Sequence, residues 1–598
     1  MRVPARAAGV LVPAALYGLL GLLRLAPVWR APNTLVQCGC GDPAFTMFYL
    51  GWTPYAVTHG HDPFFTDWLF FPSGVNTMWN VTLPLPGLLL APLTWGWGVV
   101  LSYNVLVALA FAGSALSAYL VLRRWAPWRP AAFAGGLLYG FSPYMVGQGL
   151  GHAHMLLLAL VPVLLLLLDE VLVRQRRPVW ESGPLLGAAA VAQLLTAEEV
   201  LAGAALVGAL GLVVLVVLFR DGIRARWRRA AAGLALAAGT ALVLALVPLV
   251  NQLTGPQRLV GTVNSPDQYH ADLLSWVVPS RLVKFAPAAA VRFTDGFSGN
   301  PAENGSYLGV PLLLAVVAVA VLLWRRRPVV RWAVVLLVVV MVLALGPSLS
   351  VGGDETGVPL PFQLVHHLPL LESLISVRLS SYAVLLCAFL LAVGLDALHQ
   401  LPVPRWRPRA AGLVAGLAAV VALLPLLPAQ LSYAVQDAGV PPWFRSAAAQ
   451  QRVPAGSVLV TVPAATPTDA AAMVWQAEAG YRFKVPFGYS LHPDAQGTGR
   501  FPPEPSKFLT VVSRVGRGTL PVLSPADIVT MRTDLARWQV RTIVVTMPDT
   551  PQRAAVLEVL GRVTGRAPEP DTGAWVWYGL DPAALDRLPA GPALRLAG

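Results

Sequence analysis

The sequence predicts a mainly α-helical bundle of about 11 transmembrane helices, with a small C-terminal α/β domain outside the membrane. Three observations predict this fold. Of the 598 residues, 56% are hydrophobic and 12% are charged, whereas a soluble domain carries roughly 25% charged residues. Apolar runs near the length that crosses a bilayer, about 20 residues, recur up to about residue 428. Strand-like and helix-like runs alternate after that point.

Eleven apolar runs are predicted to cross the membrane. The first run lacks a convincing small-residue cleavage site, so we expect it to be retained as a span and not removed as a signal peptide. The runs cover residues 8–27, 99–122, 131–148, 155–173, 183–198, 200–219, 230–252, 307–324, 331–346, 374–397 and 410–428.

Arginine clusters indicate which loops face the cytoplasm. Arg2 and Arg6 precede the first run, and the even-numbered runs are followed by "RRWAPWRP", "RQRRP", "RDGIRARWRR", "RRRPVVR" and "PRWRPR". The short loops between them are nearly free of Arg. Because cytoplasmic loops keep the positive charge, we expect a multi-pass plasma-membrane protein with its N-terminus inside and its C-terminal domain outside. The net charge of +13 comes from separate clusters and not from one continuous face, so no nucleic-acid partner is predicted.

Two domains follow from this topology: a membrane domain over residues 1–429 and an extracytoplasmic domain over residues 430–598. The membrane domain is expected to carry long external loops at 28–98 and 253–306, and a smaller one at 347–373. These loops lie on the same side as the C-terminal domain.

The C-terminal domain is predicted to be α/β. "SVLVTVP", "RTIVVTMP" and "AWVWYGL" are strand-like runs bounded by Pro or Gly. "TDAAAMVWQAEAG" and "SPADIVTMRTDLARW" have helical spacing and Ser or Thr starts. The domain contains neither a Gly-rich phosphate loop nor a nucleophile motif. We therefore expect it to be a lid or a substrate-docking domain.

Several stretches resemble a known superfamily. The segments "GHDPFFTDWLFFPSGVNTMWN", "PLPGLLLAPLTWGWG", "ENGSYLGVPLL" and "LPLLESLISVRLSSYAVLLCAFLLAVGLD", together with the long first and second external loops, resemble uncharacterised actinobacterial members of the GT-C superfamily of membrane glycosyltransferases. The resemblance covers most of the membrane domain. It implies transfer of a sugar from a polyprenyl-phosphate donor to a lipid, glycan or protein acceptor on the outer face of the cell envelope.

The resemblance also implies a catalytic residue. The usual base of the superfamily is an Asp or Glu just after the first span, and Asp42 occupies that place. Many relatives carry a paired acidic motif there, whereas this chain has "GDP". We therefore predict no metal site and no cofactor, although a divalent metal remains open as an alternative.

The residues around Asp42 permit two interpretations. Asp followed by Pro43 is the N-cap and N1 pair of a helix. An aromatic stripe follows at helical spacing and is expected to lay that helix in the membrane interface, apolar face down. Asp42 is then either a cap or a functional carboxylate, and the two roles are compatible. The stripe consists of Phe45, Phe48, Tyr49 and Trp52.

Arg378, at the outer end of the tenth run in "SLISVRLSSYAV", stands where the positive-inside rule disfavours Arg. It either reaches up to lipid headgroups or binds the phosphate of the carrier, for which a guanidinium is well shaped. We favour the phosphate. Glu303, before "NGSYLG", is a candidate for orienting Arg378 or the acceptor.

Other polar residues near the predicted outer surface are weaker candidates. His152 and His154 form one His-x-His pair, which lacks the third ligand of a catalytic zinc, so we expect substrate hydrogen bonding or interfacial packing. Glu198 and Glu199 fall between two runs in "LLTAEEVLAG". They are a solvated turn if exposed and usually functional if recessed, and the solvated turn is favoured.

Cys38 and Cys40 flank a single Gly outside the membrane. A bridge across one residue is strained, so free thiols and a reversible bridge are both open.

The predicted function is glycosyl transfer from the polyprenyl-phosphate donor. The alternative is a transporter or flippase for a lipid-linked glycan, or a non-catalytic assembly subunit. A transporter is expected to show repeat-related halves with broken spans, and none is visible in the sequence.

Overall fold

A computed structural model of the chain divides into two compact units. Unit 1 comprises Met1–Arg30, Asn104–Leu246 and Asn264–Ala434, and unit 2 comprises Ala31–Tyr103, Val247–Val263 and Val435–Gly598. The sequence predicts a single division near residue 430, whereas the structure groups the first external loop with the C-terminal segment. Cys38 and Cys40 lie outside the described residues. The structure describes residues 5–37, 41–261, 268–368, 371–401, 410–467, 469–501 and 506–596.

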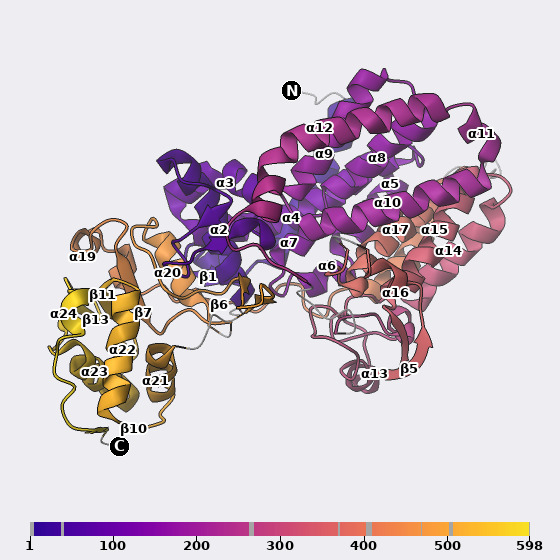
Figure 1. Cartoon of the computed structure of the whole chain (residues 1–598). Helices are drawn as coiled ribbons and strands as arrows, with labels where there is room; N and C mark the ends of the chain where they lie inside the picture. Colours follow the sequence, from indigo (N-terminus) through magenta and orange to yellow (C-terminus); the bar gives the residue numbers. More distant parts are fainter. Residues whose placement is uncertain are drawn as a thin grey trace. The chain divides into compact units, whose positions relative to one another are not determined.

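Unit 1 is helical (Figure 1). Two of its helices, α4 and α12, have one end in unit 2. A short hairpin of β4 (Ser348–Val351) and β5 (Asp354–Pro359) follows α15. The helices are α1 (Ala5–Arg24), α4 (Val99–Leu122), α5 (Arg129–Phe141), α6 (Pro143–Gln148), α7 (Ala153–Leu156), α8 (Leu160–Asp169), α9 (Val179–Leu194), α10 (Glu198–Leu218), α11 (Arg220–Arg224), α12 (Trp227–Thr254), α13 (Ala288–Thr294), α14 (Val310–Leu323), α15 (Pro328–Ala344), α16 (Phe362–Val365), α17 (Ser380–His399) and α18 (Ala410–Leu423).

Each of the eleven predicted runs contains an α-helix. In the part of the chain that the structure describes, five helical segments are long and apolar enough to cross a membrane. They indicate a multi-pass membrane protein. The longest helix in each of the other runs has 10 to 17 residues, so the number of spans stays a prediction. The five segments are Ala7–Arg24, Val99–Leu122, Glu198–Leu218, Trp227–Thr254 and Ser376–His399.

Proline explains why one of these helices is short. The run 131–148 is divided between α5 and α6, because the residue before a proline is disfavoured in the helical region. Ser142, which precedes Pro143, is extended with φ −62° and ψ 163°. Its hydroxyl then accepts a hydrogen bond from the backbone N–H of Met145 at 3.4 Å and caps α6.

The interior of unit 1 is built around α17. Almost every residue of this helix from Ser380 to Asp396 is buried, and it packs against α5, α14, α15 and α18. Small residues permit close approach between helices in such bundles. A Cβ added at Gly135 of α5 would lie 2.9 Å from the carbonyl oxygen of Ala388. By contrast, α10 and α12 expose large apolar side chains, among them Val217 and Val243, as expected of surfaces that face lipid.

Unit 2 contains the first external loop and the predicted α/β domain. The loop folds into α2 (Gly41–His59), the hairpin of β2 (Phe65–Thr66) and β3 (Val75–Asn76), and α3 (Pro84–Trp97). A further short antiparallel pair joins β1 (Leu35–Val36) to β6 (Gln436–Asp437). Helix α2 packs against α3 and against α20 (Ala471–Glu478). The first loop and the C-terminal segment therefore share one core.

The α/β domain is confirmed, with a mixed sheet in the strand order β12-β13-β11-β7. β7 (Val458–Val462) and β11 (Val540–Val545) are parallel, and β13 (Ala574–Trp577) and β12 (Glu569–Asp571) extend the sheet antiparallel. Every residue of β7 is buried, as expected of a parallel strand covered on both faces.

The helices of the α/β domain pack against this sheet. They include α21 (Lys507–Gly516), α22 (Pro525–Arg537) and α23 (Pro551–Thr564). The second predicted helical run is α22, which begins with a capping box of Ser524 and Asp527.

Candidate functional site

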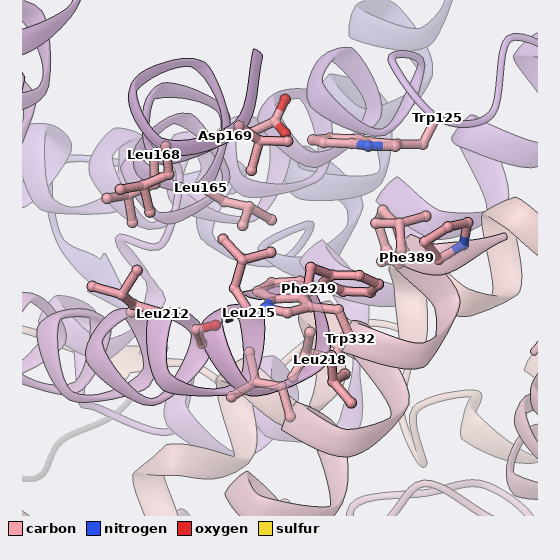
Figure 2. Close-up of a pocket in the computed structure, with 18 of the residues that line it drawn as sticks. Trp125, Leu165, Leu168, Asp169, Leu212, Leu215, Leu218, Phe219, Trp332 and Phe389 are labelled. Carbon is pink, nitrogen blue, oxygen red and sulfur yellow. Dashed lines mark hydrogen bonds between the residues drawn. The ribbon is translucent and has the colours of Figure 1, made fainter. Parts of the chain in front are cut away.

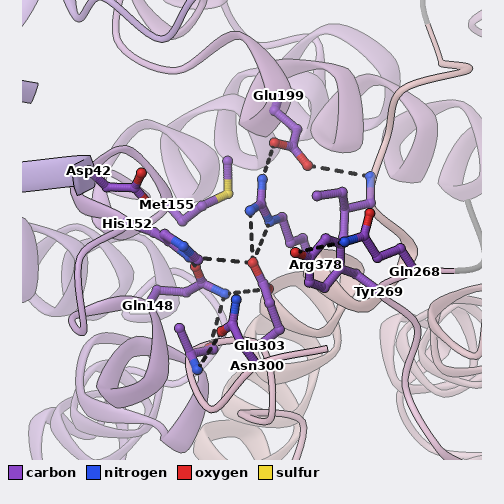
Figure 3. Close-up of polar contacts among 12 residues, drawn as sticks. Asp42, Gln148, His152, Met155, Glu199, Gln268, Tyr269, Asn300, Glu303 and Arg378 are labelled. Atoms are coloured by element: carbon purple, nitrogen blue, oxygen red, sulfur yellow. Dashed lines mark hydrogen bonds and ion pairs between the residues drawn. The ribbon is translucent and has the colours of Figure 1, made fainter. Parts of the chain in front are cut away.

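Four polar side chains of unit 1 meet in one buried cluster (Figure 3). Arg378 lies in the 3₁₀ turn Ser376–Leu379 that leads into α17, and Glu199 lies in the first turn of α10. Glu303 lies in the loop before α14, and His152 immediately precedes α7. An acidic residue in the first turn of a helix is favoured by the helix dipole, which accounts for the placement of Glu199.

The guanidinium of Arg378 lies between two carboxylates, as Figure 3 shows. Its Nε and Nη2 groups donate to Oε1 of Glu303 at 3.1 and 2.7 Å, and its Nη1 group donates to Oε2 of Glu199. Only 13% of the Arg378 side chain and 3% of the Glu303 side chain are exposed. An ion pair of this kind is expensive to break, because removing one partner leaves an uncompensated buried charge.

His152 and Gln148 also contact Glu303. Nδ1 of His152 lies 2.7 Å from Oε1 of Gln148 and 3.3 Å from Oε1 of Glu303. Both of these partners are acceptors, so the proton of the imidazole is placed on Nδ1. Nε2 of Gln148 donates to Oε2 of Glu303 at 2.8 Å. The ring of His154 is half-buried and its centroid lies 6.1 Å from that of His152.

The charges in this cluster favour an ionised Glu303. Burial of its carboxyl group alone raises its pKa, but Arg378 and His152 outweigh burial and hold the pKa of Glu303 well below its usual range. Two carboxylates then face one guanidinium. The cluster carries a net charge of −1 when His152 is neutral and 0 when it is protonated.

One prediction about this region was wrong, and one alternative is excluded. Glu199 is not part of a solvated turn, since its carboxylate pairs with Arg378 and accepts a hydrogen bond from the backbone N–H of Ile375 at 3.4 Å. The headgroup anchor is also excluded for Arg378, because an arginine that reaches for lipid headgroups keeps its guanidinium in water and this one is buried. Sequence reasoning therefore missed Glu199 as a member of the cluster.

Asp42 lies in unit 2, in the first turn of α2. The hydroxyl of Tyr489 donates to its Oδ1 atom at 2.8 Å. The helix already includes Gly41, two residues before the predicted start at Pro43, so Asp42 lies inside the first turn and is not the N-cap. A Cβ at position 41 would come within 2.8 Å of the carbonyl oxygen of Pro467. Glycine at position 41 thus lets the start of α2 approach the C-terminal segment that supplies Tyr489.

Two further hydrogen bonds hold this segment on the first loop. The hydroxyl oxygens of Tyr49 and Ser490 are 2.8 Å apart, and the backbone N–H of Leu491 donates to Oδ1 of Asn80 at 2.8 Å. Burial raises the pKa of Tyr49 above its usual range, so its hydroxyl stays protonated at neutral pH. These bonds hold the segment that carries Tyr489 on the first loop, beside the carboxylate of Asp42.

The interfacial position predicted for the aromatic stripe of α2 is wrong. Phe48, Tyr49 and Trp52 are at most 1% exposed, and they pack inside unit 2 and not against lipid. The centroid of the Tyr481 ring lies 5.3 Å from the ring centroid of Phe48 and 5.8 Å from that of Trp52. Trp68 lies 5.3 Å from Trp52. The spacing predicted the helix correctly, but the C-terminal domain covers the face that was assigned to the membrane.

The acidic residues of the first loop are engaged elsewhere. Asp67 pairs with Lys484 at 2.5 Å, and Asp62 accepts from the backbone N–H of Phe64 at 2.8 Å. Across the described ranges, no group of three or more His, Cys, Asp or Glu side chains is placed to hold a metal ion.

Comparison with known proteins identifies the family. Residues 8–373 match the family model described as "Domain of unknown function (DUF6311)". The chain belongs to this family. No curated protein sequence matches this DUF6311 protein.

Solved structures show what its fold is similar to. The arabinofuranosyltransferase AftD from Mycobacteria aligns with a TM-score of 0.54 at 15% identity, over 97% of this chain and 40% of that chain. The DUF6311 protein thus spans about two fifths of the length of that enzyme. At this identity the likeness concerns the fold alone.

Two further structures align at lower TM-scores. ArnT from Cupriavidus metallidurans, bound to undecaprenyl phosphate, aligns with a TM-score of 0.46 at 13% identity, over 95% of this chain and 98% of that chain. The oligosaccharyltransferase of Archaeoglobus fulgidus aligns with 0.45 at 13% identity, over 93% and 73%.

Proposed function

We propose that this chain is a GT-C membrane glycosyltransferase that moves a sugar from a polyprenyl-phosphate donor to an acceptor on the extracytoplasmic face. The observation that carries the proposal is Asp42, an acidic residue in the first turn of the first external helix, held there by Tyr489. The fold similar to an arabinofuranosyltransferase supports it, but folds host many functions, so the function rests on the residues.

Asp42 is the general base of the proposed reaction. A hydroxyl oxygen of the acceptor attacks the anomeric carbon of the donor sugar, and the bond from that carbon to the phosphate oxygen breaks. The electron pair leaves with the polyprenyl phosphate, and the hydroxyl proton passes to the carboxylate of Asp42. A positioned base contributes on the order of 100- to 10,000-fold in rate. The hydrogen bond from Tyr489 fixes the orientation of the carboxylate through its Oδ1 atom.

Arg378 is proposed to bind the phosphate of the donor. It has five N–H donors, and three of them make the bonds to Glu303 and Glu199. The remaining two can be offered to a phosphate oxygen in a fixed direction. Glu303 is therefore proposed to orient Arg378, as a positioning residue. Protonation of His152 would cancel the net negative charge that otherwise opposes an incoming phosphate.

His152 and His154 are proposed to hydrogen-bond the substrate, at the start of α7. The membrane-facing side of the chain is proposed to hold the polyprenyl tail, and the acceptor is a lipid, a glycan or a protein. The topology proposed is eleven spans, with the N-terminus in the cytoplasm and the C-terminal domain outside. No divalent metal is required, because the chemistry is assigned to a carboxylate and to cationic side chains.

A donor screen tests this function. Purified full-length protein is incubated with a panel of polyprenyl-phosphate pentoses and hexoses, and consumption of donor and release of polyprenyl phosphate are measured with and without a chelator. We expect release from at least one donor, and we expect it to survive chelation. Binding of a donor without release, together with its movement across proteoliposome membranes, would instead favour a flippase.

A further inference from the structure

A large apolar cavity lies inside unit 1 (Figure 2). Its volume is about 910 Å³, and its walls come from α8, α10, α15 and α17. Figure 2 shows Leu165 and Leu168 of α8 across the cavity from Leu212 and Leu215 of α10. Pockets for drug-sized ligands run from roughly 300 to 1,000 Å³, so this cavity has room for a hydrocarbon chain.

Away from its charged end, the cavity has apolar walls. Leucine, valine and aromatic side chains make up most of the lining, including Trp332 and Phe389. The indole N–H of Trp332, the polar atom of that side chain, is already donated to the carbonyl oxygen of Gly211 at 2.8 Å. Apolar cavities of this kind stay dry and take up apolar ligands.

One end of the cavity is strongly basic. It is lined by five arginines against two aspartates, a net charge of +3. Arg220 and Arg326 are exposed, and neither forms an ion pair with any residue that the structure describes. The arginines are Arg174, Arg220, Arg226, Arg326 and Arg327.

These arginines belong to the clusters that predict the cytoplasmic loops. Arg220 and Arg226 lie in "RDGIRARWRR", and Arg326 and Arg327 lie in "RRRPVVR". Both clusters are in the part of the chain assigned to the inner surface of the membrane. The charged end of the cavity therefore faces the inner leaflet, whose anionic lipids attract Lys and Arg near the surface.

The two aspartates do not cancel this charge at the unpaired arginines. Asp169 is held by Arg174 at 2.9 Å and by Arg124 at 3.1 Å. Asp221 is exposed at the start of α11. The surplus positive charge consequently lies on Arg220, Arg226 and Arg326, which form no ion pair with any residue that the structure describes.

We propose that this cavity binds an anionic phospholipid of the inner leaflet, with an acyl chain between α8 and α10 and the headgroup phosphate on Arg220 and Arg326. Charge complementarity selects an anionic headgroup, and the apolar walls select a lipid over a free phosphate. This inference goes beyond the proposed glycosyl transfer and does not depend on it.

Contacts at the opposite end of the cavity connect a bound lipid to the Arg378–Glu199 pair. Tyr382, which lines that end, donates its hydroxyl to the carbonyl oxygen of Val200 at 2.5 Å. Tyr382 is one turn of α17 beyond Arg378, and Val200 is adjacent to Glu199. A chain filling the cavity would therefore stiffen the helices that carry the Arg378–Glu199 pair, and a bound lipid should stabilise unit 1.

Native mass spectrometry of the full-length protein tests the proposal. Phosphatidylglycerol and phosphatidylcholine with identical acyl chains are titrated onto the detergent-purified protein, and the dissociation constant of each is measured. We expect saturable binding of phosphatidylglycerol and at least tenfold weaker binding of phosphatidylcholine. Each arginine near an anionic headgroup is worth about fivefold in affinity, so Arg220→Gln with Arg326→Gln should weaken phosphatidylglycerol binding about 25-fold.

Two matched controls separate this site from general effects. Arg224→Gln with Arg228→Gln changes the same charge at exposed arginines that do not line the cavity, and should leave the affinity unchanged. Gly208→Phe should block the cavity, since Gly208 lines it and its Cβ would meet only Leu168 at 3.5 Å. Gly239→Phe on α12, where nothing lies within 4 Å of the added Cβ, should bind as the parent does.

Three outcomes would overturn the proposal. The first is equal binding of both phospholipids, and the second is unchanged phosphatidylglycerol binding in the Arg220/Arg326 variant. The third is complete displacement of phosphatidylglycerol by a polyprenyl phosphate that binds the Arg220/Arg326 variant as tightly as the parent. That result would assign the cavity to the tail of the donor. Thermal melting of each variant in detergent shows whether it is folded, and an unfolded Gly208→Phe leaves the arginine pair as the deciding comparison.

Discussion

Arg378 is held by carboxylates that lie far away in the sequence. Glu199 is 179 residues before it and Glu303 is 75 residues before it. Buried ion pairs do not add much net stability, but removing one partner strands the other charge. The cluster is therefore sensitive to any change that keeps the shape of a side chain and removes its charge.

Glu303→Gln should destabilise the protein by about 1–3 kcal/mol, because Arg378 keeps its pair with Glu199 but the single oxygen of an amide cannot replace both carboxylate oxygens, which accept from Arg378 and from Gln148. The loss should persist from pH 7 to pH 5. A carboxyl group whose pKa is lowered in the folded state contributes its stability above the unfolded pKa, about 4.3 for Glu, and loses it only as the pH falls through the lower folded value. Thermal melting of parent and variant at pH 7 and pH 5 measures this. A difference that disappears at pH 5 would contradict the lowered pKa of Glu303.

Arg378→Lys keeps the charge but loses the planar fork. We expect it to retain part of the transfer activity, and Arg378→Ala to retain very little, while both variants still insert in the membrane. Arg281→Ala is the control, since Arg281 also pairs with a carboxylate, Asp295, but does so with 51% of its side chain exposed, where such pairs contribute little. If Arg378→Ala transfers sugar at the parent rate, the phosphate-binding role is wrong.

The sequence allowed some of these residues to be predicted and not others. Arg378 was recognisable because arginine is disfavoured at the outer end of a span. Glu303 was recognisable only as an acidic residue near that surface. Glu199 was misjudged, because nothing local distinguishes a solvated turn from one that a distant arginine neutralises. Long-range pairing of this kind is decided by helix packing, which the pattern of apolar residues leaves open.

At the scale of elements, α2 shows the same limit. Its aromatic spacing predicted a helix, and the helix is present at Gly41–His59. The spacing of apolar residues defines a buried face but not the partner that buries it. The partner is the C-terminal domain, whose Tyr481 also donates its hydroxyl to the carbonyl oxygen of Phe48 at 2.5 Å.

Trp52→Ala should therefore destabilise unit 2 by about 3–5 kcal/mol, the usual cost of emptying a large aromatic site in a core. Val57→Ala on the same helix is the control, because Val57 is 54% exposed and should change stability little. Thermal melting and the rate of limited proteolysis of the C-terminal domain report the effect. A Trp52→Ala variant as stable as Val57→Ala would mean that the stripe faces lipid after all.

At the scale of the whole molecule, the helices were the most predictable feature. Each apolar run contains a helix because hydrocarbon requires every backbone group to be paired within the segment. The C-terminal strands were also recognisable, from β-branched runs such as "VLVTV" in β7. The packing of the first loop against the C-terminal domain could not be predicted from the sequence, since it depends on contacts between segments about 400 residues apart.

The topology makes a whole-molecule prediction. A reporter that is active only in the cytoplasm should be silent when fused after Gly598 and active when inserted in the "RRRP" loop. The reverse pattern would place the C-terminal domain, and with it Asp42, on the cytoplasmic side. That result would contradict an extracytoplasmic reaction.

The most direct test of the central claim, that Asp42 is the base of a sugar transfer, is the transfer rate of Asp42→Asn. Asparagine keeps the shape of the side chain and can still accept a hydrogen bond from Tyr489, but an amide cannot take the proton of the acceptor at neutral pH. With the donor identified by the screen, Asp42→Asn should melt and bind donor as the parent does, yet transfer sugar about 100- to 10,000-fold more slowly. Transfer by Asp42→Asn at the parent rate would contradict the claim and leave Asp42 with a structural role alone.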